Sequence, residues 1–378
     1  MRGIEMRDRM KKIRSMLGTA ALLCLSAAVM AMPEPTSLGV KNGLEVCLST
    51  IIPSLFPMML VSIMAVESGL AQRVGKWLSP VSNKLFYLPG EAGAAVLLSV
   101  IGGYPAGAKA VTELYERGAV SREQAGRMSL FCFCAGPGFL VGLVGGLTGN
   151  RMLGWLLVAV QMAAVLLTGV LFGRIGQKKD ENLSENLCIN GSSSCGITEA
   201  LVSSAGKAAK AILQVCLYVI IFSAFNEMLD GVGASRIVVN TLEDIGMRPA
   251  VAEAVLPVLL EVTGGCVRAA GAGLPLVAFA VGFGGLSVIM QVISITEKVG
   301  VNRWRFFTAR VFQGTISAVL TAMAMELLPG DLVMTASGSL AHAELSGSPQ
   351  GAVMLVVMCA MCVLCLPESE KRKYEYKA

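Results

Sequence analysis

The chain has 378 residues, of which 54% are hydrophobic and 15% are charged, with a formal net charge of +5. A soluble domain usually carries about 25% charged residues, so this composition and a mean hydropathy of +0.67 exclude a soluble fold. Nucleic acid is not an expected partner, because the positive excess belongs to basic segments beside apolar runs and suits anionic lipid headgroups.

Apolar runs follow one another along the chain. The first, Leu17 to Met32, comes after a basic segment, which predicts an uncleaved first helix or, as the alternative, a secretory signal. Several runs reach the roughly 20 residues that span a bilayer as a helix, and none alternates as a barrel strand would. We therefore predict an all-α polytopic membrane protein of about 8 spanning helices. The further uncharged runs are 46–66, 92–108, 128–150, 152–173, 269–296, 311–325 and 350–366.

A seven-residue repeat organises the middle of the chain. Leu97–Gly103 (LLSVIGG) recurs as Leu259–Gly265 (LLEVTGG), with five of seven positions identical at an offset of 162 residues. A long apolar helix is expected before each copy, over 46–66 and 211–229, and a Gly-rich apolar helix and another span after each. This common order of elements predicts an internal repeat.

The distribution of lysine and arginine indicates how the two copies meet the membrane. If 92–108 crossed completely, segments 109–127 and 174–210, with four and five Lys or Arg, would lie outside against the positive-inside rule. Re-entrant Gly-rich hairpins over 92–108 and 250–268 instead place both segments, and both chain termini, in the cytoplasm. The halves then have inverted topology, as in many secondary transporters; alternatively, the glycines only let helices pack closely. The basic residues left outside are Lys41, Arg151, Arg236, Arg248 and Arg268.

Two groups of motifs resemble a known family. In the first half they are Gly102–Lys109 (GGYPAGAK), Glu113–Tyr115 (ELY) and Cys134–Phe139 (CAGPGF). In the second half they are Leu260–Gly265 (LEVTGG) and Gly282–Val288 (GFGGLSV), followed by Gln291. With these motifs the region 44–328 resembles the YlbJ-type sporulation integral membrane proteins of the nucleoside-recognition or gate-domain superfamily.

The resemblance implies a transporter in the cell or forespore membrane of an endospore-forming bacterium. Its implied task is the export of dipicolinate toward the developing spore. Two positions depart from the pattern of the relatives. Cys132-Phe133-Cys134 stands where they typically have an Asn pair, and Ile289 stands where they have His. These positions mark places where specificity can differ.

Five regions follow from the topology and the resemblance. Residues 1–43 are expected to form a cytoplasmic N-tail and first helix, and 44–173 the first gate-like repeat. A cytoplasmic linker is expected over 174–210 and the second gate-like repeat over 211–328. Residues 329–378 complete the chain as an outside loop, a last helix and a basic C-tail.

The predicted hairpin tips are the first candidate site. A re-entrant tip frees backbone N–H groups and a half-helix N-terminus is positive, so an anion could bind there. Lys109 and Arg268 lie just beyond the two tips, so a dicarboxylate could meet one cation from each half. For Lys109 the alternative is a positive-inside flank. The tip residues are Gly102, Gly103, Pro105, Gly107, Gly264 and Gly265.

Four other residues complete the predicted substrate site. Glu261 lies in an apolar run, where a carboxylate usually faces a cavity or a partner. It could relay a proton, bind a coupling cation or pair with Arg268. Ser287 and Gln291 share one helix face and could hydrogen-bond a carboxylate or a ring nitrogen, or join helices instead. Tyr104 could stack on an aromatic substrate or pack the tip.

The expected function is transport of a small anionic solute by alternating access, with homo-oligomer formation left open. A non-transporting scaffold for spore assembly and a nucleoside-type transporter are the alternatives. An enzyme is not expected, because the sequence has no HExxH, GxSxG or GxxxxGK[ST] motif. Neither a cofactor nor a metal is expected, and cysteines within apolar runs are interpreted as packing residues.

Overall fold

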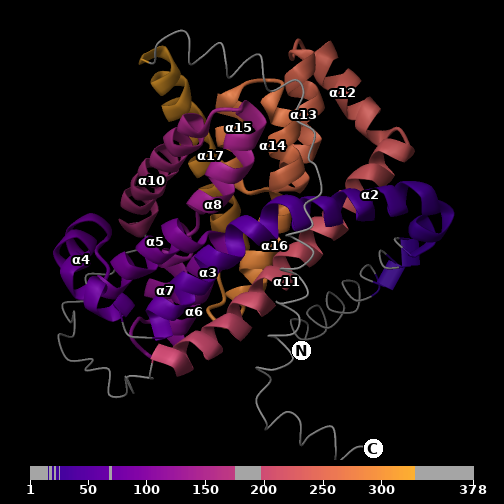
Figure 1. The fold of residues 1–378 in the computed structure, drawn as a ribbon. Coiled ribbons are helices and arrows are strands. Elements are labelled where there is room, and N and C mark those ends of the chain that lie inside the picture. The colour runs from indigo at the N-terminus through magenta and orange to yellow at the C-terminus, as the bar shows by residue number, and fades with distance from the viewer. Residues whose placement is uncertain are drawn as a thin grey trace, which may run out of the picture.

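The computed structural model describes residues 16, 19–20, 23–24, 26–67, 70–174 and 197–327 (Figure 1). These residues form helices and irregular connections but no strand, so the all-α prediction is confirmed for them. The predicted last helix over 350–366 and most of the predicted linker lie outside the described residues. The elements are α2 (Pro33–Val46), η1 (Cys47–Ile51), α3 (Ile52–Glu67), α4 (Leu70–Phe86), α5 (Gly90–Gly102), α6 (Tyr104–Glu116), α7 (Arg122–Met128), α8 (Pro137–Phe139), η2 (Leu140–Val144), α9 (Gly145–Thr148), α10 (Arg151–Arg174), α11 (Ile197–Gly231), α12 (Ala234–Asp244), α13 (Pro249–Leu260), α14 (Val262–Ala270), α15 (Leu274–Phe283), α16 (Gly285–Ile295) and α17 (Arg303–Leu327).

Several helices have the length and composition of membrane spans. In the described part of the chain there are four, namely Pro33–Ala65, Arg151–Arg174, Leu201–Gly231 and Leu274–Ile295. Other apolar helices are shorter than the roughly 20 residues needed, because helix breaks interrupt their runs. The chain is therefore a multi-pass integral membrane protein, while a total of about 8 spans stays a prediction. The shorter helices are Ala92–Gly102, Pro137–Thr148 and Pro249–Leu260.

The two halves of the fold repeat the same order of elements. Each begins with a long helix, α3 or α11, and continues with an amphipathic helix, α4 or α12. Two interrupted helices follow in each half, and a long helix, α10 or α17, ends it. Figure 1 shows α4 and α12 on opposite sides of the view. This order supports the predicted internal repeat, whereas the re-entrant hairpins and the inverted placement of the halves stay predictions.

The helices break at different kinds of residue in the two halves. Between α5 and α6 the break is Gly103, whose φ of 81° and ψ of −174° suit glycine. Between α13 and α14 it is Glu261, which is extended and caps α14 with its side chain. The predicted second tip is therefore corrected: Gly264 and Gly265 lie in the first turn of α14 and not at the break. The seven-residue repeat aligns Gly103 with Gly265, so it does not align the two breaks.

Each half contains a second break that lies against the first. In the first half the irregular segment 129–136 separates α7 from α8. A Cβ built on Gly136 would lie 3.2 Å from the backbone nitrogen of Gly103. In the second half α15 meets α16 at a glycine pair, and a Cβ on Gly285 would lie 3.0 Å from the nitrogen of Glu261. The four breaks thus form two close backbone crossings, one in each half.

Close backbone packing also joins α2 to α11. Gly39 and Gly43 face α11, and a Cβ on Gly43 would lie 2.8 Å from the Cα of Ile220. A side chain at either glycine would force the helices apart, so small residues set this approach, as they commonly do in membranes. α11 begins at Ile197, so the helix extends into the region 174–210 that was predicted to be a linker.

Candidate functional site

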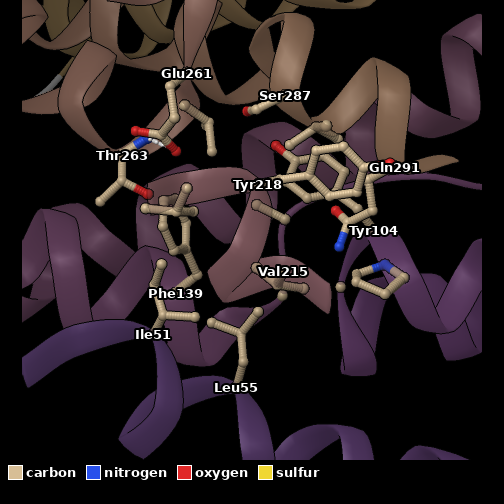
Figure 2. A pocket seen from close by; sticks show the side chains of 17 residues that line it. Ile51, Leu55, Tyr104, Phe139, Val215, Tyr218, Glu261, Thr263, Ser287 and Gln291 are labelled. Carbon is tan, nitrogen blue, oxygen red and sulfur yellow. Dashed lines mark hydrogen bonds between the residues drawn. The ribbon is translucent and has the colours of Figure 1, made fainter. Parts of the chain in front are cut away.

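A small cavity lies where the two backbone crossings meet (Figure 2). Its walls are the first turns of α6, α14 and α16, the end of segment 129–136, and side chains of η1, α3, α8 and α11. The cavity has a volume of about 30 Å³, which leaves room for about one or two water molecules. Segments next to all four helix breaks, from both halves, therefore surround one point.

Three helices begin at this cavity. α6, α14 and α16 have 13, 9 and 11 residues, and first-turn residues of each line the cavity. A helix N-terminus carries about half a positive charge and binds anions. No side chain caps α6 or α16, whereas Glu261 caps α14. The uncapped N-termini of α6 and α16 therefore favour a negatively charged group in the cavity.

Three buried polar groups in the cavity wall have no hydrogen-bond partner. They are the hydroxyl oxygens of Thr263 and Ser287 and the amide nitrogen of Gln291, in residues that are 1%, 2% and 3% exposed. A buried polar group left unpaired costs about 1–3 kcal/mol. Figure 2 shows all three side chains around the same cavity. Their gathering at one place indicates a site for a polar ligand.

Glu261 separates the cavity from a larger cleft and lines both spaces. One carboxylate oxygen accepts a hydrogen bond from the Thr263 N–H at 2.8 Å, and the other accepts one from the Gly264 N–H at 2.6 Å. The carboxylate thus occupies the N–H groups that were predicted to hold a substrate anion at this tip. The positive end of α14 offsets its charge. Gly264 and Gly265 line the cleft and not the cavity.

The cleft lies between α2, α11, α13 and α14 and has a volume of about 440 Å³. Its charged side chains are Glu45, Glu227, Glu261 and Arg268. Arg268 is exposed in the cleft, and within the described residues it forms no ion pair with Glu261. The structural pair that the sequence left open is therefore not formed.

The first-half tip reaches the cavity through three consecutive residues. Gly103, Tyr104 and Pro105 all line it. The Tyr104 hydroxyl donates a hydrogen bond to the carbonyl oxygen of Val281 in α15, so it joins the first half to the second. The ring of Tyr104 lies against the cavity while its hydroxyl has a structural partner. The packing role is thus observed, and stacking on an aromatic substrate stays a prediction.

The remaining predicted site residues lie elsewhere. Gly102 and Gly107 are packing positions, and a Cβ on Gly107 would collide with the carbonyl oxygen of Cys132. Lys109 lines a separate space between α3, α5 and α6. The structure therefore does not bring Lys109 together with Arg268, and a solute in the cavity would not meet one cation from each half.

Arg310 is a buried residue that the sequence analysis did not single out, because it begins an apolar run and resembles a basic flank. It is 1% exposed in α17, and its guanidinium donates to the carbonyl oxygens of Leu130 and Phe133, each at 2.8 Å. A signal was present, since polar residues recur every three or four positions along one face of this helix and are all buried. That polar face consists of Arg310, Gln313, Ser317 and Thr321.

Comparison with known proteins agrees with this architecture. Residues 48–173 match the Gate family, which is described as nucleoside recognition. Together with the apolar spans, this match describes a multi-pass membrane protein in which residues 48–173 are similar to the Gate family. The chain is also similar to the sporulation integral membrane protein YlbJ of Bacillus subtilis (strain 168), with 27% identity over 340 residues that cover 83% of each chain. The matches confirm the resemblance to the YlbJ-type proteins, and no solved structure matches the chain.

Proposed function

We propose that the protein transports a small anionic solute across the membrane by alternating access. The convergence of helix N-termini and unpartnered polar groups on one cavity between the two halves is the main support. Interrupted helices whose N-termini point at an anionic substrate group recur in secondary transporters. The similarity to YlbJ supports a role in sporulation.

The chemistry of the cavity favours a carboxylate ligand. Thr263, Ser287 and Gln291 each offer a donor, and α6 and α16 add uncapped N-termini. Glu261 is the acidic residue of the lining, and its oxygens are already bound to N–H groups of α14. Dipicolinate, with two carboxylates on an aromatic ring, is the first candidate cargo. The ring of Tyr104 is available to stack against it.

The cleft is the proposed entrance to the cavity. Pockets for small molecules usually measure about 300 Å³ or more. The cleft of about 440 Å³ reaches this size, and the cavity of about 30 Å³ does not. The arrangement therefore corresponds to a state in which the cleft can admit a small molecule and the cavity is too small to hold one. A shift of Glu261 together with α14 would join the two spaces.

Two other functions have less support. A nucleoside-type solute is suggested by the description of the matched family, and hydroxyl and amide groups also suit a neutral base or ribose. A non-transporting scaffold would have no use for three unpartnered polar groups in one buried cavity, because each lowers its stability.

Uptake into liposomes tests the proposal. Dipicolinate and a panel of nucleosides are followed for purified wild type, Ser287→Ala and Ser62→Ala. Ser62 is the matched control, because its hydroxyl is equally buried and unpartnered but lies away from the cavity. We expect saturable dipicolinate uptake that falls about tenfold in Ser287→Ala, as the loss of one hydrogen bond to a charged group predicts. Ser62→Ala should transport normally.

The other outcomes discriminate between the candidates. Nucleoside uptake with the same dependence on Ser287 would replace the anionic cargo with a neutral one. Absence of both activities in wild type that is folded and inserted would favour the scaffold. Arg268→Ala, measured alongside, examines the cleft: if Arg268 attracts the anion, its loss should raise KM more than it lowers kcat.

A further inference from the structure

Arg310 supplies hydrogen bonds to a segment that has left helical geometry. The irregular segment 129–136 lies between α7 and α8, so its carbonyl groups lack the partners that a continuous helix would give them. In a membrane each unsatisfied carbonyl costs several kcal/mol. Arg310 donates to the carbonyl oxygens of Leu130 and Phe133, and the Gln313 amide donates to Phe133 at 3.3 Å. Two side chains of α17 therefore replace part of the missing helix ladder.

Two aromatic rings also lie close to the guanidinium. Its central carbon lies 5.9 Å from the ring centroid of Phe133 and 5.4 Å from that of Phe306. These rings are within the range of cation–π attraction. Arginine suits such a place, because its planar fork reaches two carbonyls and stacks on rings, whereas lysine presents one compact charge. Arg310 does not itself line the cavity, so it holds the segment from outside the cavity.

The charge of Arg310 is not matched by a carboxylate. No acidic side chain forms an ion pair with it in the part of the chain that the structure describes. Buried charges are usually paired with an opposite charge, and here carbonyl dipoles and ring faces offset the cation instead. The carbonyl ends at segment 129–136 would otherwise present negative potential, and Arg310 neutralises them. The end of the same segment, Ala135 and Gly136, lines the cavity.

We propose that Arg310 is a positioning and specificity-determining residue for the cavity. It holds segment 129–136 in its irregular conformation, so that Ala135 and Gly136 can form a cavity wall. Its charge lies behind this wall and raises the preference of the cavity for anions, because charges act over longer distances in a low-dielectric interior. The positioning role stands by itself, and the specificity role rests on the proposed function.

Two native cysteines report on the positioning role. Cys132 and Cys134 flank Phe133 in the held segment and are 0% and 1% exposed, so they should resist a maleimide reagent. We expect Arg310→Gln to raise their labelling rate at least about tenfold, the size expected for the loss of hydrogen bonds to a charged group. The labelling rate in Arg310→Lys should lie between those of wild type and Arg310→Gln, since the lysine ammonium can reach one carbonyl. Peptide mass spectrometry identifies the labelled thiol.

Cys266 in α14 is an internal control for unfolding. It is 0% exposed and lies in α14, outside segment 129–136. Labelling of Cys132 and Cys134 without labelling of Cys266 shows local release of the segment and supports the proposal. Equal labelling of all three cysteines in Arg310→Gln shows general unfolding. The positioning role is then judged in Arg310→Lys, the milder variant, by whether Cys132 and Cys134 are labelled faster than Cys266. Full protection of Cys132 and Cys134 in folded Arg310→Gln would overturn the positioning role.

The uptake ratio of dipicolinate to nucleoside in liposomes tests the specificity role. Arg310→Lys keeps the charge and should keep the ratio of wild type even if both rates fall. Arg310→Gln removes the charge and should lower the ratio about tenfold or more, by weakening anion binding. An unchanged ratio in Arg310→Gln would overturn this role. If wild type carries neither solute, the proposed function fails, and the labelling experiment still decides the positioning role.

Discussion

At the scale of single residues, the cavity is defined by polar groups whose hydrogen bonds are not used. Thr263 and Ser287 place hydroxyl groups in the interior with no protein partner, although most buried polar groups in proteins are paired. Gln291 adds an unpartnered amide nitrogen on the same helix as Ser287. A site that binds a ligand accounts for all three, because the partner then comes from the solute.

Removing these hydroxyls should change stability and affinity in opposite directions. Thr263→Val is nearly isosteric and keeps the N–H that Glu261 accepts from. We expect it to raise the free energy of unfolding of the solute-free protein by about 1 kcal/mol, because an unpaired buried group is removed. Solute affinity should fall by about tenfold. Thermal unfolding in detergent and a binding titration measure the two quantities.

A buried threonine that already has a partner provides the control. Thr168 donates to the Ala164 carbonyl oxygen at 2.7 Å within α10 and does not line the cavity. Thr168→Val should leave affinity unchanged and should not increase stability. If Thr263→Val lowers stability as Thr168→Val does, the Thr263 hydroxyl has a structural role and the reading of the cavity is wrong.

Glu261 stabilises the N-terminus of α14, which its side chain caps. Glu261→Gln keeps the size of the side chain but retains only one acceptor oxygen for the two N–H groups of Thr263 and Gly264. We expect a loss of about 1–2 kcal/mol in stability, as for other lost N-caps. Glu261→Asp should be tolerated better, because aspartate is a good N-cap. Equal stability of wild type and Glu261→Gln in thermal unfolding would contradict the capping role.

At the scale of elements, the crossings of broken helices depend on glycines that permit backbone contact. Gly107 in α6 approaches the carbonyl of Cys132, so a side chain there must displace backbone. Gly107→Ala should destabilise the protein by about 2 kcal/mol or more, within the range for overpacked cores. Gly126→Ala in α7 is the control, since nothing lies within 4 Å of its Cβ and alanine favours a helix. The thermal unfolding temperature should therefore fall in Gly107→Ala and rise in Gly126→Ala.

The elements also show which parts of the fold could be predicted from the sequence. The break at Gly103 could be predicted from the sequence, because a Gly-Gly-Tyr-Pro stretch cannot continue a helix smoothly. The break at Glu261 was predicted three to four residues late, at Gly264 and Gly265, because a carboxylate replaces glycine there and the seven-residue repeat favoured the wrong alignment. Glu261, Ser287 and Gln291 could each be named as candidates, since an acid in an apolar run and a shared helix face are visible in sequence, and the structure places all three around one cavity. Their contacts depend on how the halves pack, which a sequence does not reveal.

At the scale of the whole molecule, the amphipathic helices α4 and α12 occupy equivalent places in the two halves and lie on opposite sides of Figure 1. Their charges differ in sign. α4 contains Arg73, Lys76 and Lys84 and no acid, whereas α12 contains one arginine and two acids. The positive-inside rule counts lysine and arginine, three in α4 and one in α12, and therefore predicts α4 on the cytoplasmic face and α12 on the outer face. Inverted halves would have this placement.

Labelling of intact cells tests this topology. Trp77 in α4 and Ile237 in α12 are 86% and 68% exposed, so Trp77→Cys and Ile237→Cys introduce accessible thiols. A membrane-impermeant maleimide should label only the α12 position in intact cells and both positions after permeabilisation. Peptide mapping separates these sites from native cysteines. Labelling of both positions, or of α4 alone, in intact cells would contradict the inverted arrangement.

The glycine contact between α2 and α11 has a mechanical consequence. Backbones that touch at Gly39 and Gly43 cannot slide past each other without separating, so these two helices must shift as one body. They make one wall of the cleft, and α13 and α14 make the other. Any closing of the cleft should therefore move α2 and α11 together relative to α13 and α14, the wall that carries Glu261. A crosslink between α2 and α11 should leave uptake intact, whereas one between α2 and α14 should stop it.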